Sequence, residues 1–265
     1  MEVRDLYNKV PFSAYGQDYS VLLKSVTEVP KGDAIEVGCG AGHICAYLSS
    51  RFNRVLGVDI SENSIAQAKQ ETKSRGIKNV RYQVENLFDD GFVEKHQSKF
   101  DYVLCYGVLH HTGKPRKGYA ILSKLLKSKS ILTIGVYSCS LLQYRIQRKA
   151  VLLRAGDDLK RRAEVAQSMV FGGRGSDVAI SDGFVNQHVS FHSIREVMGW
   201  IRENGLEYVG SHPPIELSKC FKLIFKRELR VLRIFDHNLL SYWFIEFLWA
   251  ISGRSVMLNV SAKKN

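Results

Sequence analysis

Acidic and glycine residues near the start of the chain have the spacing of a nucleoside-binding turn. Glu36 lies two residues before Gly38, the first of three glycines (Gly38, Gly40 and Gly42), and Asp59 follows Gly38 by 21 positions. Glycines let a strand turn sharply into a helix against a ligand, because a Cβ there would collide with the ligand or strain the turn. In a βαβ unit the Asp59 carboxylate lies at the tip of the neighbouring strand, where it can accept hydrogen bonds from both hydroxyls of a ribose.

The position of the third glycine separates two kinds of nucleotide ligand. The dinucleotide fingerprint is G-x-G-x-x-G, which holds a pyrophosphate at the helix N-terminus. Here the spacing is G-x-G-x-G, and the Glu36 carboxylate would repel a pyrophosphate but suit a ligand that carries an ammonium group. A nicotinamide oxidoreductase is an alternative function, but the spacing of the three glycines argues against it.

Two segments of the chain resemble one enzyme family. E-V-G-C-G-A-G with a downstream V-D resembles motifs I and II of the class I S-adenosylmethionine-dependent methyltransferases. F-D-Y-V-L-C-Y-G-V-L-H-H-T, over 100–112, resembles the stretch after strand four in the small-molecule, type 11/12-like branch of that family. The resemblance covers about 19–137, 191–214 and the last strand. It implies an α/β, Rossmann-like fold whose seven-stranded, mostly parallel sheet has the order 3-2-1-4-5-7-6, with helices on both faces.

The same resemblance assigns residues to S-adenosylmethionine, the implied cofactor. The glycine loop and its acid would hold the aminocarboxypropyl end, and Asp59 with its neighbour Ile60 would contact the ribose. Asn86 and Leu87 would hold adenine, because an amide can address the adenine edge while a leucine covers its face. The predicted cofactor contacts are Glu36, Gly38, Cys39, Gly40, Gly42, Asp59, Ile60, Asn86, Leu87 and Tyr106.

Four residues are candidates for chemistry on the methyl acceptor: His110, His111, His188 and Tyr137. A histidine can take a proton from a hydroxyl or a carbon acid near neutral pH, and a packing or capping role is the alternative for each of the three. The stretch from Asp182 to His188 resembles one in related bacterial methyltransferases. A sulfonium methyl group is already a reactive electrophile, so alignment and exclusion of water supply much of the rate, and no catalytic dyad is required.

Alternating apolar strands and amphipathic helices are expected to position these residues. A leading helix is expected over 19–26, and Tyr7 or Tyr15, if not simply packed, can reach the cofactor from this end of the chain. Further helices are predicted over 43–52, between Ser61 and Gly76, and over 118–126 and 194–205. Strands are predicted over 34–37, 54–58, 80–84, 100–105, 130–136, 206–210 and 256–262, with the last one antiparallel between the fifth and sixth.

Two stretches exceed this minimal fold, within what is predicted to be one domain over 1–265. Residues 139–190 are basic and are predicted to form a lid over the active-site rim. In 216–253, Lys219, Lys222, Lys226, Arg230 and Arg233 would share a helical stripe of roughly 80°. The apolar run 239–251 is too short to span a bilayer. It is expected to pack in the core or wall an apolar acceptor pocket, with a dimer interface or a membrane-surface anchor as alternatives.

Composition narrows the class of protein without naming an acceptor. The 265 residues carry 38 Lys and Arg against 26 Asp and Glu, a net charge of +12, and five cysteines without zinc-site spacing, so no metal is predicted. No signal peptide or membrane span is evident, which indicates a cytoplasmic enzyme. The predicted function is methylation of a small-molecule or lipid-like acceptor. An RNA methyltransferase is an alternative suggested by the charge, although the tetrapeptide of base N-methylating relatives is absent; a catalytically silent cofactor-binding protein is another.

Overall fold

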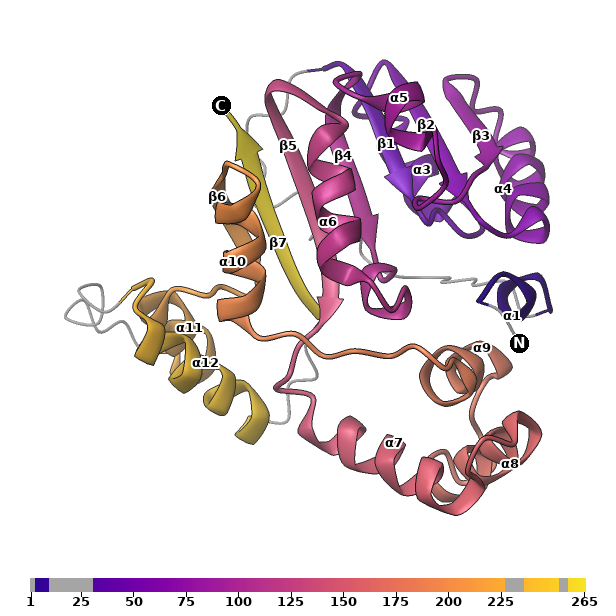
Figure 1. Ribbon diagram of the computed structural model, residues 1–265, viewed down its shortest axis with the longest axis vertical. Helices are drawn as coiled ribbons and strands as arrows, with labels where there is room; N and C mark the ends of the chain where they lie inside the picture. Colours follow the sequence, from indigo (N-terminus) through magenta and orange to yellow (C-terminus); the bar gives the residue numbers. More distant parts are fainter. Residues whose placement is uncertain (1–2, 10–30, 227–235, 253–256) are drawn as a thin grey trace.

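The computed structural model describes residues 3–9, 31–226, 236–252 and 257–265. Within them, seven strands form one sheet in the order β3-β2-β1-β4-β5-β7-β6 (Figure 1). Strand β7 runs antiparallel to both β5 and β6, and the other neighbouring strands pair in parallel. This confirms the predicted order and direction of the strands. Their bounds are β1 Asp33–Val37, β2 Arg54–Asp59, β3 Val80–Val84, β4 Phe100–Tyr106, β5 Leu126–Tyr137, β6 Leu206–His212 and β7 Met257–Lys264.

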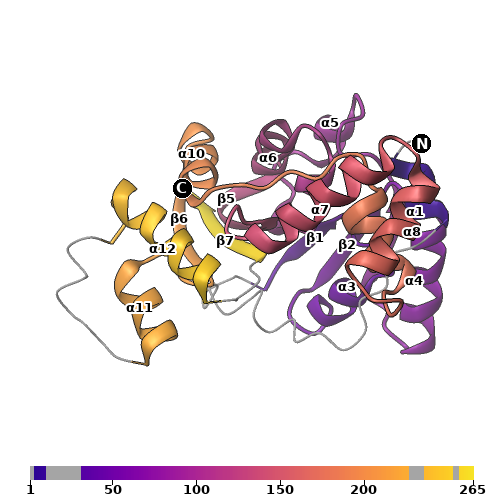
Figure 2. The ribbon, with the colours of Figure 1, turned by 90° about the horizontal axis from the view of Figure 1, so that it is seen from below.

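Helices cover both faces of the sheet, as the fold class requires. Seen from below, α5, α6 and α10 lie over one face, and α3 and α4 lie over the other (Figure 2). The bounds of these helices are α3 His43–Leu48, α4 Glu62–Ser74, α5 Phe92–His96, α6 Pro115–Lys124 and α10 Ile194–Glu203. A short 3-10 turn, η1 Leu109–His111, follows β4.

The central strands are buried on both faces because successive side chains point to opposite sides of a strand. Ile35 and Val103 pack into the apolar cluster that also holds residues of α6 and α10. Their neighbours Ala34 and Leu104 pack into the cluster on the α3 side. The sequence of each central strand is accordingly a continuous apolar run. The core is therefore divided into two layers, one on each face of the sheet.

A third group of helices lies at the carboxyl ends of the parallel strands (Figure 1). It comprises α1 Val3–Lys9, α7 Leu142–Ala155, α8 Leu159–Met169, α9 Asp177–Ile180 and the π-helical turn η2 Ser181–Val185. Leu6 of α1 joins Val151 and Phe184 in a small apolar cluster of its own, so the N-terminal helix packs against residues from the middle of the chain. The remaining helices, α11 Leu217–Phe225 and α12 Leu239–Ile251, connect β6 to β7.

Several predicted boundaries differ from those in the structure. Strand β5 begins at Leu126, not at residue 130, because Leu126 is buried and pairs with Phe100 of β4. Helix α3 ends at Leu48 and buries Cys45 rather than Ala46. Helix α1 was not predicted. The predicted leading helix over 19–26, Tyr15, Arg230 and Arg233 lie outside the described residues.

Candidate active site

A cavity of about 740 Å³ lies at the carboxyl ends of β1, β2, β4 and β5, a size typical of a small-molecule site. Asp59, Tyr106 and Tyr137 each end a strand and line this cavity. All the predicted site residues except Gly42 line it: Glu36, Gly38, Cys39, Gly40, Asp59, Ile60, Asn86, Leu87, Tyr106, His110, His111, Tyr137 and His188. The structure therefore brings these residues together around one cavity, and their surroundings are described below.

The glycine loop is shaped by the protein itself at two of its three glycines. A Cβ on Gly38 would come within 2.2 Å of Val108 Cγ2, and one on Gly42 within 2.5 Å of the Tyr82 hydroxyl. Both residues also have positive φ angles, +79° and +80°. A side chain at these two positions would therefore strain the turn, as expected, and would also meet neighbouring side chains of the protein itself.

Asp59 is held in place by the backbone of the glycine loop. Its Oδ2 accepts a hydrogen bond from the Gly40 N–H at 2.9 Å, and its Oδ1 accepts one from the Ser61 N–H at 2.9 Å. Burial raises the pKa of this carboxyl, while the backbone N–H groups act to lower it. Because each carboxylate oxygen can accept more than one hydrogen bond, Asp59 keeps acceptor capacity toward the cavity.

Glu36 does not provide the fixed negative charge that the sequence suggested. It is 1% exposed, and its Oε2 accepts a hydrogen bond from the Cys45 thiol at 2.9 Å. Burial raises the pKa of Glu36 to about 8, and the nearby Asp59 contributes in the same direction. At pH 7 the carboxyl is therefore mostly protonated unless a cation lies beside it.

The two residues predicted to hold adenine follow β3 and are fixed differently. The Asn86 side-chain oxygen accepts the Phe88 N–H at 3.0 Å, which leaves the amide N–H₂ as the group that can address a ligand. Leu87 is buried in the main core and lines the cavity. The polar and apolar partners expected for a purine are therefore both present at this end of the cavity.

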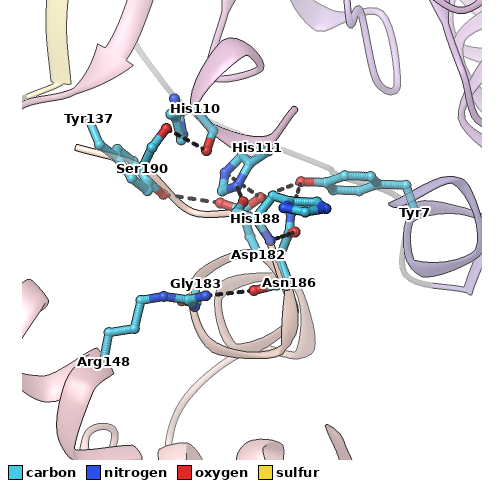
Figure 3. A network of polar contacts seen from close by, with 10 residues as sticks. All are labelled: Tyr7, His110, His111, Tyr137, Arg148, Asp182, Gly183, Asn186, His188 and Ser190. Carbon is cyan, nitrogen blue, oxygen red and sulfur yellow. Dashed lines mark hydrogen bonds and ion pairs between the residues drawn. The ribbon is translucent and has the colours of Figure 1, made fainter. Parts of the chain in front are cut away.

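Asp182, which also lines the cavity, is the centre of a polar network (Figure 3). Its Oδ1 accepts a hydrogen bond from the Tyr7 hydroxyl at 2.7 Å, and its Oδ2 accepts one from the Tyr137 hydroxyl at 3.1 Å. His111 Nε2 lies 3.2 Å from Oδ1, an ion-pair contact without the alignment of a hydrogen bond. Burial alone would raise the pKa of Asp182, but His111 and the Tyr7 hydroxyl outweigh it and hold this pKa well below its usual range.

The three predicted histidines have different surroundings. His111 Nδ1 lies 3.1 Å from the His188 carbonyl oxygen, so both of its ring nitrogens face acceptors. His110 is 1% exposed and stacks on Tyr137 with ring centroids 3.9 Å apart. Burial lowers the pKa of His110 well below its usual value, and neither of its ring nitrogens has a hydrogen-bond partner among the described residues. The His188 side chain is exposed at the cavity wall.

The π-helical turn η2 and the strand-like segment after it hold the network in place. The buried guanidinium of Arg148 donates to the carbonyl oxygens of Gly183 and Asn186, the latter at 2.7 Å. The Asn186 side-chain oxygen in turn accepts the His188 N–H at 3.0 Å. Neither Asp182 nor Asn186 was predicted as a site residue. The signal that could have identified them is the stretch D-G-F-V-N-Q-H, in which both precede the predicted His188.

A second cavity of about 370 Å³ adjoins the first through Tyr137 and Asp182, which line both. Half of its other wall residues are aromatic, and these residues come from α7, from the turn after α8, from α9 and from η2: Tyr144, Gln147, Val170, Phe171, Ala179 and Phe184. No described residue of α12 lines either cavity, so the interpretation of 239–251 as the wall of an acceptor pocket is wrong. The buried half of α12 packs in the main core instead.

The described residues contain no group of three or more His, Cys, Asp and Glu side chains arranged to hold a metal ion. The five cysteines are all free thiols. Among the helices that the structure describes, none combines the length and the apolar character needed to cross a membrane.

The curated proteins that resemble this chain include several methyltransferases. The chain is 29% identical over 100 residues to a ubiquinone biosynthesis O-methyltransferase of Saccharophagus degradans, covering 38% of this chain and 41% of that protein. Such matches span only 37–47% of the length of three curated relatives, this one included.

Solved structures share the fold at low sequence identity. PKMT2 from Rickettsia typhi in complex with AdoHcy has a TM-score of 0.63 and 15% identity, with 92% of this chain and 51% of that chain covered. Geranyl diphosphate C-methyltransferase from Streptomyces coelicolor, in complex with Mg²⁺, geranyl diphosphate and S-adenosyl-L-homocysteine, has a TM-score of 0.53 and 17% identity, with 93% and 78% covered.

A family model described as a methyltransferase domain matches residues 29–195, more than half of the chain. The matched residues include the glycine loop, the Asp59 carboxylate and the histidine network around the cavity. With its sheet order, glycine loop and sequence match in agreement, this chain belongs to the class I S-adenosylmethionine-dependent methyltransferases.

Proposed function

We propose that this protein methylates a small, lipid-like acceptor. The observation that carries the proposal is a pair of adjoining cavities. An anchored carboxylate beside a glycine loop lines the larger one, and aromatic side chains line much of the smaller one, which is called the aromatic chamber below. The similarity to a ubiquinone biosynthesis O-methyltransferase and to a geranyl diphosphate C-methyltransferase supports an apolar acceptor.

The residues of the larger cavity fit S-adenosylmethionine, which when bound supplies a methyl group on a positively charged sulfur. Asp59 would accept the ribose hydroxyls, since the Gly40 and Ser61 N–H groups fix its orientation. Asn86 and Leu87 would hold the adenine. Glu36 would face the ammonium group, with Gly38, Cys39 and Gly40 beside it, while Ile60 and Tyr106 complete the walls.

Residues 139–190 are proposed to act as a lid within one methyltransferase domain that spans 1–265, with 216–253 as a second helical insertion. The lid places Asp182 against Tyr7 of α1 and Tyr137 of β5, which closes the end of the cavity nearest the aromatic chamber. Because burial raises the pKa of Tyr137 well above its usual value, this residue stays protonated and donates its O–H to Asp182, while its oxygen can still accept a hydrogen bond from an acceptor.

His188 is the proposed proton acceptor when the methyl acceptor must lose a proton. His111 has acceptors at both ring nitrogens, and the ring nitrogens of His110 are buried, so neither offers an accessible lone pair. The His188 ring is exposed at the cavity wall, and its backbone is held by Asn186 and His111. His111 and His110 would position the lid and Tyr137.

Replacing His188 with alanine is expected to lower kcat by about 100-fold, because general base catalysis typically contributes at least that factor. The affinity for S-adenosylhomocysteine should not change, since His188 lies at the acceptor end. Steady-state rates with and without added imidazole provide the check, and imidazole should restore part of the activity. The neighbouring Gln187→Ala variant is the control, and an unchanged kcat in His188→Ala would exclude the proposed base.

Binding of a ligand with an ammonium group should release a proton from Glu36. With a pKa of about 8, the free carboxyl is about 90% protonated at pH 7, whereas a neighbouring ammonium favours the carboxylate. Calorimetry with S-adenosylhomocysteine in buffers of different ionisation enthalpy should give about 0.9 more protons released by the wild type than by Glu36→Gln. The affinity of the wild type for S-adenosylhomocysteine, relative to that of Glu36→Gln, should rise as pH increases toward 8. Equal proton release in the two proteins would show that Glu36 does not face the ammonium group.

The methyl transfer itself is tested with S-adenosylmethionine labelled in its methyl group. The acceptor panel contains a hydroxylated prenylquinone, a prenyl diphosphate and tRNA, and label that enters an organic phase is the expected result. Label on the tRNA at low salt would instead favour the RNA alternative, which the net charge of +12 makes worth including. Tight S-adenosylhomocysteine binding with no transfer to any acceptor would contradict an enzymatic role.

A further inference from the structure

The exposed apolar side chains of this protein are concentrated on three helices. In the part of the chain that the structure describes, fourteen large apolar residues are exposed, and eleven of them belong to α7, α11 and α12. These eleven, called the apolar surface below, are Leu142, Ile146, Leu153, Leu223, Phe225, Leu239, Leu240, Trp243, Phe244, Phe247 and Ile251. Such clustering marks an interaction surface, since exposed apolar residues scattered singly are the ordinary case.

Helix α12 contributes more than half of this surface because it is apolar all round. Tyr242, Ile245 and Trp249 face the main core and are nearly fully buried. On the other side, Trp243 is 68% exposed and stacks on Phe247 with ring centroids 6.1 Å apart. The core therefore accounts for one side of α12 only, and its aromatic outer side is left facing solvent.

Basic residues are interspersed with the apolar surface. Helix α7 carries Arg145, Lys149 and Arg154 as exposed basic side chains, and α11 carries Lys219 and Lys222, whereas α12 has no Lys or Arg. The only acidic residue of these three helices, Glu246 of α12, is half-buried and accepts the Ile194 N–H at 2.5 Å. The outer face of this group of helices therefore combines apolar and positive character without exposed negative charge.

The apolar surface lies at the same end of the molecule as the cavities. Helices α12 and α7 lie next to each other at the carboxyl end of the sheet in both views (Figures 1 and 2). Helix α7 also contributes Tyr144 and Gln147 to the wall of the aromatic chamber. One helix therefore contacts the smaller cavity on its inner side and presents Leu142, Ile146 and Leu153 to solvent on its outer side.

We propose that α7, α11 and α12 bind the surface of an anionic lipid bilayer. An amphipathic surface with lysines, arginines and a tryptophan suits the interface between headgroups and acyl chains, where it lies without spanning the membrane. Anionic headgroups complement the basic residues. A second copy of the chain fits less well, because a two-fold interface would place these like charges opposite one another. This binding does not depend on the identity of the methyl acceptor.

The test uses Trp243 as a built-in probe. The chain has three tryptophans, and Trp200 and Trp249 are 2% and 1% exposed, so a change in emission on binding reports Trp243. The full-length protein is mixed with vesicles of phosphatidylcholine alone or with 30–40% phosphatidylglycerol, a range chosen to resemble an anionic membrane. We expect a blue shift and co-sedimentation with the anionic vesicles, weakened at least about tenfold by raising the salt from 0.05 M to 0.5 M.

Matched variants separate the two contributions to binding. Leu240→Ser with Phe247→Ser should abolish sedimentation with anionic vesicles. Lys149→Gln combined with Lys226→Gln, at the exposed residue that directly follows α11, should weaken it about tenfold. Lys69→Gln with Lys73→Gln removes the same charge from exposed positions of α4 and should leave binding unchanged. Unchanged S-adenosylhomocysteine binding verifies that each variant is folded.

Three results would overturn the proposal. The first is the absence of binding to either kind of vesicle. The second is equal binding to neutral and anionic vesicles, which would remove the role of the basic residues. The third is self-association without vesicles in analytical ultracentrifugation that the Leu240→Ser and Phe247→Ser changes abolish, because the apolar surface would then be a dimer interface.

Discussion

Replacing Asp59 with alanine should lower the affinity for S-adenosylhomocysteine by at least about 100-fold. A carboxylate that accepts hydrogen bonds from ligand hydroxyls contributes about 1.5–3 kcal/mol for each, and two such bonds are available to a ribose. The substitution also leaves the Gly40 and Ser61 N–H groups without their acceptor, so the glycine loop loses one of its contacts with β2 and keeps the hydrogen bonds from Gly38 and Cys39 N–H to the Val58 carbonyl oxygen. Isothermal titration calorimetry measures the loss directly.

Two further variants make the Asp59 result specific. Asp59→Asn keeps one side-chain oxygen as an acceptor and should retain an intermediate affinity. Glu62→Gln, three residues later at the exposed start of α4, removes a negative charge of the same region and should bind normally. Full affinity in Asp59→Ala, with the fold intact, would mean that the cavity holds its nucleoside in another way or holds none.

Replacing Asp182 with alanine should lower the melting temperature by about 10 °C. A hydrogen bond to a charged group contributes about 1.5–3 kcal/mol, so losing the two from Tyr7 and Tyr137 costs about 3–5 kcal/mol, and a protein of this size loses about 2–4 °C for each kcal/mol. The change leaves Tyr7, His111 and Tyr137 without their shared partner, although they come from three different elements. Thermal unfolding followed by circular dichroism measures the effect, and the rate of methyl transfer should fall with it.

The pH dependence of that stability loss has a defined sign. The folded protein holds the pKa of Asp182 below its usual value of about 4, so this carboxylate stabilises the fold above that pH. Its contribution is lost as pH falls through the folded-state pKa, and the wild type and Asp182→Ala should then converge. Asp177→Ala, at the exposed start of α9, is the control and should cost less than about 1 kcal/mol. A difference that grows on acidification would contradict the assigned ion pair.

The sequence was sufficient for the sheet and for the placement of the glycine loop beside Asp59. Parallel strands that are buried on both faces require continuous apolar runs, and these runs identified the strands. The distance from Gly38 to Asp59 is the length of one βαβ unit, so it placed the carboxylate at the tip of β2 before any contact was known. Both properties are local or periodic, which is why residue order alone determines them.

Three features were decided only by the tertiary structure. They are the grouping of the residues proposed to face the acceptor, the charge of Glu36 and the solvent-exposed side of α12. Tyr7, His111, Tyr137 and Asp182 are up to 175 positions apart, and no periodicity links them. The protonation of Glu36 depends on how completely its neighbours exclude water, and the exposure of Trp243 depends on which side of α12 the core covers. A sequence fixes which side chains are available, but desolvation and long-range contacts arise only when separate segments pack together.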